Sequence, residues 1–280
     1  MRSIRTAVLG LALLASGCGT VATADVEAST SPEVSVSSDE LVLRAEYTGG
    51  FVPPQYTYSR LPTVSIYADG RVITEGPQIA IYPGPALPNV LVRTISHDQL
   101  EKLVTDTRRA GVGKPFDYGT PGVADVPSTR FTLVDGGKRV TSEVYALGQN
   151  DEWDKQLSSP QRAARARMRT LFSTLTDVPG TGEDRPYRPE AVATIVRAYT
   201  PGGEGPKQAE RAWRGAALPG PVVGPADLHC LTSTGAVAER ILADATEANT
   251  ETPWTSGGQK WSVTFRPLLP DESGCASLGR

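Results

Sequence analysis

The chain has 280 residues, a length that fits one large domain or two small ones. Hydrophobic residues make up 39% of it and charged residues 21%, which excludes a polytopic membrane protein and a disordered chain. The formal net charge is −3, so the chain lacks the overall basic field that nucleic-acid binding usually needs. We therefore expect a globular protein with no nucleic-acid partner.

The N-terminal sequence predicts an export signal. Arg2 and Arg5 precede an apolar run from Ala7 to Leu14, the order of charge and hydrophobicity that is typical of a secretory signal peptide. A membrane-spanning helix needs about 20 apolar residues, and this run is much shorter. We predict a signal peptide over residues 1–17.

The end of this segment, Leu14-Ala15-Ser16-Gly17-Cys18, resembles the lipobox of bacterial lipoproteins, with Ala15 at a position where Leu is commoner. The resemblance implies cleavage before Cys18 and attachment of a diacylglycerol, with acyl chains such as palmitate, to its thiol. Two acyl chains suffice for stable anchoring, which would place the protein on the extracytoplasmic face of the cell membrane. The alternative is a plain secretory signal in which Cys18 is incidental.

Residues 18–38 contain Pro32 and show no apolar period, which predicts a flexible tether between the anchor and the folded part. Loss of residues 1–17 removes the two positive charges of Arg2 and Arg5, so the net charge goes from −3 to −5. We do not expect so acidic a chain to bind to anionic lipid through its charge.

Residues 39–178 are expected to form a first α+β domain. An alternating segment at residues 41–47 predicts its first strand. Asp69-Gly70 and Asp135-Gly136-Gly137 each separate two further alternating segments, and both turns accept the positive φ angles of a hairpin.

A capped helix is expected after each hairpin. Ser96 and Gln99 have the spacing of a capping box, and Gly111 ends that helix. Ser159-Pro160 opens the second helix. Its apolar face is predicted to hold Ala164, Met168, Leu171, Phe172 and Leu175.

A linker rich in Pro and Gly is predicted at residues 179–189, followed by a second domain at 190–280. Its expected elements are strands at 191–199, 208–214 and 260–266, a loop at 216–226, and a helix at 235–248. The fold class we predict is α+β, with two small units of antiparallel sheet and helices packed on one face.

The cysteines point to a disulfide. Without the lipidated Cys18, Cys230 and Cys275 are the only two left, and disulfides persist outside the cytoplasm. A reactive or metal-binding Cys230 beside His229 is the alternative, but few further ligands are at hand. We therefore expect the disulfide, with no metal and no cofactor.

Classical hydrolase motifs are absent from the sequence. Only His97 and His229 could serve a Ser-His-Asp site, and no Gly-x-Ser-x-Gly, Ser-x-x-Lys or His-Glu-x-x-His pattern occurs. The string Gly111-Val112-Gly113-Lys114-Pro115 lacks the first glycine of a phosphate loop and reads as a helix stop.

Two sets of charged residues stay open as candidates. Glycoside chemistry needs only two acids at the right separation, and the acids that could supply them are Asp117, Asp125, Asp151, Glu152, Asp154, Asp271 and Glu272. A basic helix that could touch phospholipid or wall polymer carries Arg162, Arg165, Arg167 and Arg169. The alternative for both sets is an ordinary solvated surface.

Three passages resemble uncharacterised lipoproteins of high-GC Gram-positive (actinobacterial) bacteria: Pro62 to Gly76, Tyr118 to Asp125, and Phe265 to Glu272 with Cys275 after it. The resemblance implies a location and an architecture, and no activity. We therefore keep two hypotheses. The favoured one is a non-enzymatic binding module that contacts an envelope protein or cell-wall polymer, and the alternative is a carboxylate-dependent cell-wall hydrolase.

Overall fold

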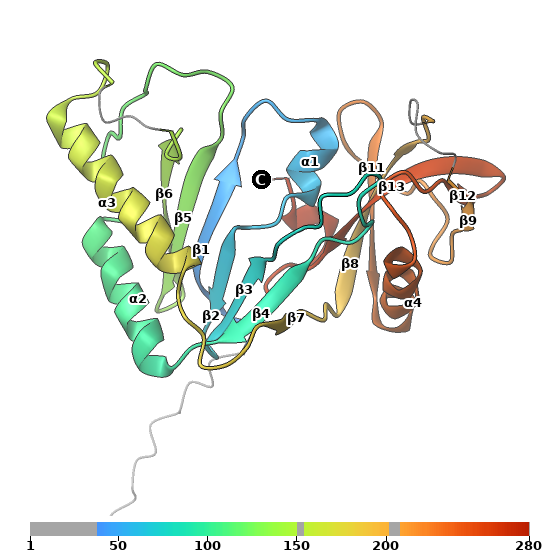
Figure 1. Cartoon of the computed structure of the whole chain (residues 1–280), viewed down its shortest axis with the longest axis horizontal. Helices are drawn as coiled ribbons and strands as arrows, with labels where there is room; N and C mark the ends of the chain where they lie inside the picture. Colours follow the sequence, from blue (N-terminus) through green and yellow to red (C-terminus); the bar gives the residue numbers. More distant parts are fainter. Residues whose placement is uncertain (1–37, 150–153, 202–207, 280) are drawn as a thin grey trace, which may run out of the picture. The chain divides into compact units, whose positions relative to one another are not determined.

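A computed structural model describes residues 38–149, 154–201 and 208–279. These residues belong to one compact unit, Val36–Arg280. Within the described residues the strands form two sheets, one of seven strands in the order β6-β5-β1-β2-β3-β4-β7 and one of six in the order β10-β11-β8-β13-β12-β9 (Figure 1). The predicted α+β class, with antiparallel sheets and helices packed against them, is confirmed.

The first sheet is antiparallel at each of its strand pairs. Its strands are β1 Leu41–Thr48, β2 Val64–Tyr67, β3 Arg71–Glu75, β4 Val90–Thr94, β5 Ser128–Asp135, β6 Lys138–Tyr145 and β7 Arg185–Pro186. Both predicted hairpins are present, and β1 lies between them, paired with β2 on one side and β5 on the other.

Helices α2 (His97–Ala110) and α3 (Ser159–Thr176) cover one face of this sheet and pack against each other (Figure 1). The predicted capping box of Ser96 and Gln99 is formed, and Gly111 ends α2 in the left-handed conformation. The second helix begins at Ser159, as predicted. Its N-terminus is closed by an unpredicted capping box between Ser158 and Gln161.

The core between sheet and helices follows from strand alternation. Successive strand residues point to opposite faces, so Leu43 and Ala45 of β1 face the helices and Arg44 faces away. From α3, the buried apolar residues are Ala164, Met168, Leu171 and Leu175, and Phe172 is partly buried at the edge of the same cluster. The predicted apolar face of α3 is therefore confirmed.

The second sheet has α4 (Gly235–Thr246) packed on it, with Ile241 beside Trp254 and Phe265 in the core. Its strands are β8 Ala191–Ala198, β9 Arg211–Ala212, β10 Val222–Gly224, β11 Leu228–Thr234, β12 Trp254–Ser256 and β13 Gln259–Pro267. The strand expected at 208–214 is reduced to β9, in which Arg211 and Ala212 pair with Trp254 and Thr255 of β12. The loop expected at 216–226 contains β10, which pairs with the unpredicted β11.

The two sheets are tied together after β13. The chain returns from Pro267 to the first sheet, where Leu269 is buried in one cluster with Tyr67 and Ile73. The hydroxyl of Tyr187 donates a hydrogen bond to the carbonyl oxygen of Leu268, 2.9 Å away. Residues 179–189, the predicted linker, include β7, which pairs with β4. The short helix α1 (Pro54–Ser59) also contacts β13.

The predicted disulfide is present. Cys230 on β11 and Cys275 on the short 3-10 helix η1 (Cys275–Ser277) are joined, with their Cα atoms 6.0 Å apart. The sequence separation is 45 residues, for which the chain-entropy model gives a stabilisation of about 4 kcal/mol. The bond fixes the C-terminal segment to the second sheet.

The first hairpin turn gives a direct test of this sheet. Gly70 has a φ of +82°, and a Cβ atom there would lie 2.6 Å from the carbonyl oxygen of Ile95. We predict that Gly70→Val lowers the free energy of unfolding by about 2 kcal/mol or more, measured by urea denaturation.

Gly148→Ala is the matched control, because a Cβ at Gly148 would have no neighbour within 4 Å and its φ is not in the left-handed region. It should change the unfolding free energy by less than about 0.5 kcal/mol. An equally small effect of Gly70→Val would contradict the turn geometry.

Candidate functional site

A polar cleft of about 670 Å³ lies on the face of the first sheet that points away from α2 and α3. Its floor is made by β1, β5 and β6, and its walls by α1 and the C-terminal segment. The floor side chains alternate with the buried apolar ones along each strand. They are Arg44, Glu46, Thr48, Arg130, Thr132, Arg139, Thr141 and Glu143.

Strand register places opposite charges beside one another on this floor. Glu46 pairs with Arg130 across β1 and β5, and Arg130 pairs with Glu143 across β5 and β6. The Nη2 atom of Arg130 lies 3.1 Å from Oε2 of Glu143, and its Nη1 atom lies 4.0 Å from Oε1 of Glu46. One guanidinium therefore serves two carboxylates, each of which keeps acceptor capacity for a ligand.

A nearly buried ion pair joins the floor to the wall. Arg44, which is 7% exposed, donates from Nη2 to Oδ1 of Asp271 at 2.7 Å and from Nε to Oγ of Ser65 at 2.9 Å. The hydroxyl of Tyr67 donates to the same oxygen of Asp271 at 2.8 Å. Burial, and after it the carboxylate of Asp271, raises the pKa of Tyr67, so the phenol stays a proton donor.

A second buried pair fixes the turn that carries Asp271. Nη2 of Arg266 lies 2.7 Å from Oε1 of Glu272, with side chains 1% and 7% exposed. The other oxygen of Glu272 accepts from the backbone N–H of Leu269 at 2.7 Å. Removing one partner of such a pair typically costs about 3–5 kcal/mol, because it leaves a buried charge without a partner. Asp271 and Glu272 thus hold the wall in place.

The cleft carries a local excess of positive charge. Its lining includes five arginines and four acids, which leaves a formal charge of +1 within a chain whose net charge is −3. The arginines are Arg44, Arg60, Arg130, Arg139 and Arg266, and the acids are Glu46, Glu143, Asp271 and Glu272.

Two of these arginines have no carboxylate partner in the part of the chain that the structure describes. Arg60 donates to the carbonyl oxygen of Gly49 and lies over the ring of Tyr56. Arg139 is exposed on β6 and is in no ion pair with a described acid. Both guanidinium groups can therefore accept an anion from solution without first breaking a bond to an acid.

The cleft also offers hydroxyl groups and one unusual acid. Thr48, Thr57, Thr132, Thr141 and Ser277 line it. The hydroxyl of Thr48 already donates to Oε1 of Glu143, and that of Ser277 donates to the carbonyl oxygen of Gly274, but both oxygens can still accept a hydrogen bond. Burial raises the pKa of Glu46 despite the nearby charges of Arg44 and Arg130. The arrangement suits a ligand that carries both negative charge and hydroxyl groups.

Of the candidate acids in the described part of the chain, two line the cleft. These are Asp271 and Glu272, and both are committed to the ion pairs of the wall. Asp117 accepts from the side chain of Gln161, and Asp154 accepts from the backbone of Gly122, away from the cleft lining. Asp125 has a φ of +61° in the loop before β5. Asp151 and Glu152 lie outside the described residues, as does Cys18.

The histidines have local partners. Nε2 of His97 lies 3.1 Å from Oε1 of Glu101, one turn further along α2. Nδ1 of His229 lies 2.7 Å from the carbonyl oxygen of Gly220, and neither His lines the cleft.

The four arginines of α3 do not form one basic face. Arg165 is fully buried and donates to the carbonyl oxygen of Ala146 at 3.0 Å, whereas Arg167 is exposed. Arg162 donates to backbone carbonyls before the helix, among them that of Leu157, and Arg169 is half-buried. A basic patch along this helix is therefore not formed.

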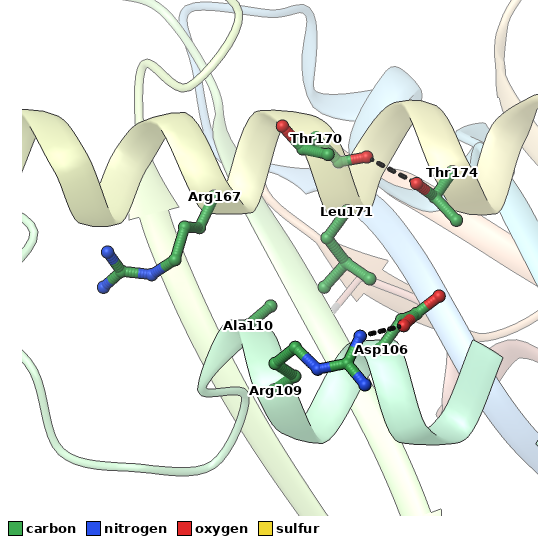
Figure 2. Close-up of a pocket in the computed structure, with 7 residues that line it drawn as sticks. All are labelled: Asp106, Arg109, Ala110, Arg167, Thr170, Leu171 and Thr174. Atoms are coloured by element: carbon green, nitrogen blue, oxygen red, sulfur yellow. Dashed lines mark hydrogen bonds and ion pairs between the residues drawn. The ribbon is translucent and has the colours of Figure 1, made fainter. Parts of the chain in front are cut away.

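A smaller groove of about 280 Å³ lies between α2 and α3, and Figure 2 shows Leu171 pointing from α3 toward α2 within it. Its polar groups are engaged nearby: Arg109 pairs with Asp106, and the hydroxyl of Thr174 donates to the carbonyl oxygen of Thr170. Asp106, Arg109 and Arg167 are its charged residues, against nine charged residues in the larger cleft, so we place the candidate site in the cleft.

The floor of the cleft was not predicted from the sequence. Its charged residues lie at the polar positions of segments that alternate as strands: Arg44, Glu46, Arg130, Arg139 and Glu143. The available signal was the density of charge at these alternating positions, since a solvated sheet face needs no arginine on each of three strands.

Comparisons with family models, with curated proteins and with solved structures found no match. Among the described residues, no helix is both long enough and apolar enough to cross a membrane. The same residues hold no group of three or more His, Cys, Asp or Glu side chains that could bind a metal ion.

The pKa of Glu46 gives a prediction for stability. Because burial raises this pKa above the usual value of 4.5, the folded state binds the proton more tightly than the unfolded state. The resulting stabilisation is present below about pH 4.5 and is lost as pH rises through the folded-state pKa. Glu46→Gln should therefore gain stability relative to the unmodified protein between pH 4 and pH 8, measured by thermal unfolding.

Glu239→Gln, at an exposed position of α4, serves as the control and should follow the unmodified protein across this range. A Glu46→Gln difference that stays constant with pH would show that the carboxyl group is not destabilised by its burial.

Proposed function

We propose that the chain is a lipid-anchored protein on the extracytoplasmic face of a bacterial cell membrane, and that it is a binding module for an acidic, hydroxyl-bearing polymer of the cell wall. The cleft carries the proposal. Its arginines outnumber its acids, and Arg139 has no carboxylate partner in the described part of the chain.

Guanidinium chemistry supports an anionic ligand. Arginine binds carboxylate and phosphate groups through paired N–H donors, and the bond is roughly twice as strong as one between neutral groups. Thr141 is exposed on β6, opposite the buried Thr132 of β5, and can exchange hydrogen bonds with ligand hydroxyls. An acidic cell-wall polymer offers both kinds of group.

The location rests on two features of the cysteines. Cys18 ends a segment that resembles a lipobox, and the remaining pair, Cys230 and Cys275, is joined as a disulfide. Disulfides persist in oxidising compartments, which supports a place outside the cytoplasm.

A carboxylate-dependent cell-wall hydrolase is the second candidate. Glu46 favours it, because an acid whose pKa is raised by burial in a cleft can act as a general acid. Glu143 on the far side of Arg130 would be the second carboxylate. We prefer binding for two reasons. Glu46 and Glu143 share the single cation of Arg130, and Asp271 and Glu272 are engaged in the ion pairs of the wall.

The anchor is tested at Cys18. We predict that Cys18→Ala moves the protein from the membrane fraction to the medium, or leaves its signal peptide uncleaved, and that incorporation of labelled palmitate stops. A mutant that stays in the membrane fraction and still takes up the label would contradict the lipobox interpretation.

The binding cleft is tested with two oligosaccharides of equal length, hexagalacturonate and the neutral maltohexaose. We predict that the full chain, extracted in detergent, binds the acidic probe in isothermal titration, and that Arg139→Ala weakens this binding about 5- to 20-fold. The physical reason is the loss of a charge-assisted bond of about 1–2 kcal/mol.

Arg240→Ala, at an exposed arginine of α4 outside the cleft, is the matched control and should bind the probe as the unmodified protein does. Equal binding of both probes, or equal effects of the two substitutions, would contradict the proposal. Release of new reducing ends from the acidic probe, abolished by Glu46→Gln, would favour the hydrolase.

A further inference from the structure

The loop between β3 and β4 exposes a run of apolar side chains. Residues 77–82, here called the tip, have the sequence Pro-Gln-Ile-Ala-Ile-Tyr and are all exposed. The exposed fractions of Ile79, Ile81 and Tyr82 are 62%, 59% and 70%. Large exposed apolar groups that follow one another in the chain usually mark a contact with a partner or a membrane.

The tip is held at a fixed place. At its neck, the N–H of Gly76 donates to the carbonyl oxygen of Asn89 at 2.7 Å, and the side chain of Asn89 donates to the carbonyl oxygen of Pro77 at 2.9 Å. Beyond the tip, the N–H of Ala86 donates to the carbonyl oxygen of Ala248 at 3.2 Å. The apolar side chains are thus presented by a loop that is bonded at both ends.

The whole loop, residues 76–89, contains no Asp, Glu, Lys or Arg. The cost of bringing a charged group into the membrane interface is therefore absent over this stretch. Isoleucine gains by leaving water, and tyrosine is enriched at the level of the lipid headgroups because its ring is apolar and its hydroxyl polar.

A protein partner fits the tip less well. A stable protein interface buries about 1,200–2,000 Å² and carries about ten hydrogen bonds across a polar rim. Six residues without a charged group bury little area and form few hydrogen bonds. A contact between two copies of the tip would lack area and hydrogen bonds in the same way. Shallow insertion in a bilayer needs only the three side chains, with the backbone groups left at headgroup depth where water is present.

We infer that the tip at residues 77–82 inserts into the interface of a lipid bilayer, as a second membrane contact beside the anchor. The inference rests on the proposed membrane location, but it concerns residues of the folded part and not Cys18. The tip is uncharged and the chain is acidic, so attraction to anionic lipid does not drive the contact with the bilayer. Insertion of the apolar side chains drives it, and a bilayer of zwitterionic lipid is sufficient for binding.

The experiment uses the chain from residue 18 onward with Cys18→Ser, so that no acyl chain contributes, and vesicles of pure phosphatidylcholine. We expect the protein to sediment with the vesicles, with a partition coefficient that does not fall between 0.05 and 0.5 M salt. The triple variant Ile79→Ser/Ile81→Ser/Tyr82→Ser should lower this coefficient at least tenfold, and Ile81→Asp alone should act in the same direction.

The double variant Phe51→Ser/Val222→Ser is the matched control, because these side chains are 86% and 63% exposed elsewhere in the chain. It should stay within twofold of the parent. The inference is overturned if the parent does not sediment with the vesicles or if the triple variant sediments equally well. It is also overturned if the triple variant abolishes only a dimer seen by sedimentation velocity. Because the assay needs no acylation, its failure is separate from a failure of the Cys18 prediction.

Discussion

The ion pair between Arg44 and Asp271 is the contact on which the rest of the molecule depends. Arg44 lies on β1, between the two hairpins, and its guanidinium is nearly excluded from water. A charge in such a place must be paired, and the pair comes from a residue 227 positions further along the chain. The segment after β13 must therefore return to the first sheet. When it does, Asp271 and Glu272 become one wall of the cleft, and the open half of the sheet becomes its floor.

Local signals were enough to predict much of the fold. The turns at Gly70 and Gly136 and the capping box of Ser96 act within a few residues, so each can be read without knowledge of the rest of the chain. The disulfide followed from the count of cysteines. In contrast, β9 and β10 are short edge strands whose pairing depends on β12 and β11, and no local pattern specifies that.

The cleft could not be predicted from the sequence, because its groups come from distant strands. Glu46, Arg130 and Glu143 meet only because β5 pairs with β1 and β6 in one particular register, and a shift of one residue would turn each of them toward the helices. The arginines of α3 are the opposite case, in which the sequence suggested a shared site that the fold does not form. They are close in sequence and suggested a common basic face, yet Arg165 points inward and satisfies backbone carbonyls of buried loops.

The distribution of partners among the cleft charges favours binding over catalysis. Asp271 and Glu272 each neutralise a buried guanidinium, so neither can leave its arginine to act on a ligand without exposing a buried charge to an apolar surrounding. Glu46 and Glu143 share Arg130, and their position is set by that shared cation. Arg139 differs from all of them, because its charge acts on Glu46 without forming an ion pair with that or any other described acid. An incoming anion therefore gains a charge-assisted bond at Arg139, whereas hydrolysis would need a second carboxylate beside Glu46, and Glu143, which would supply it, is held by the same Arg130.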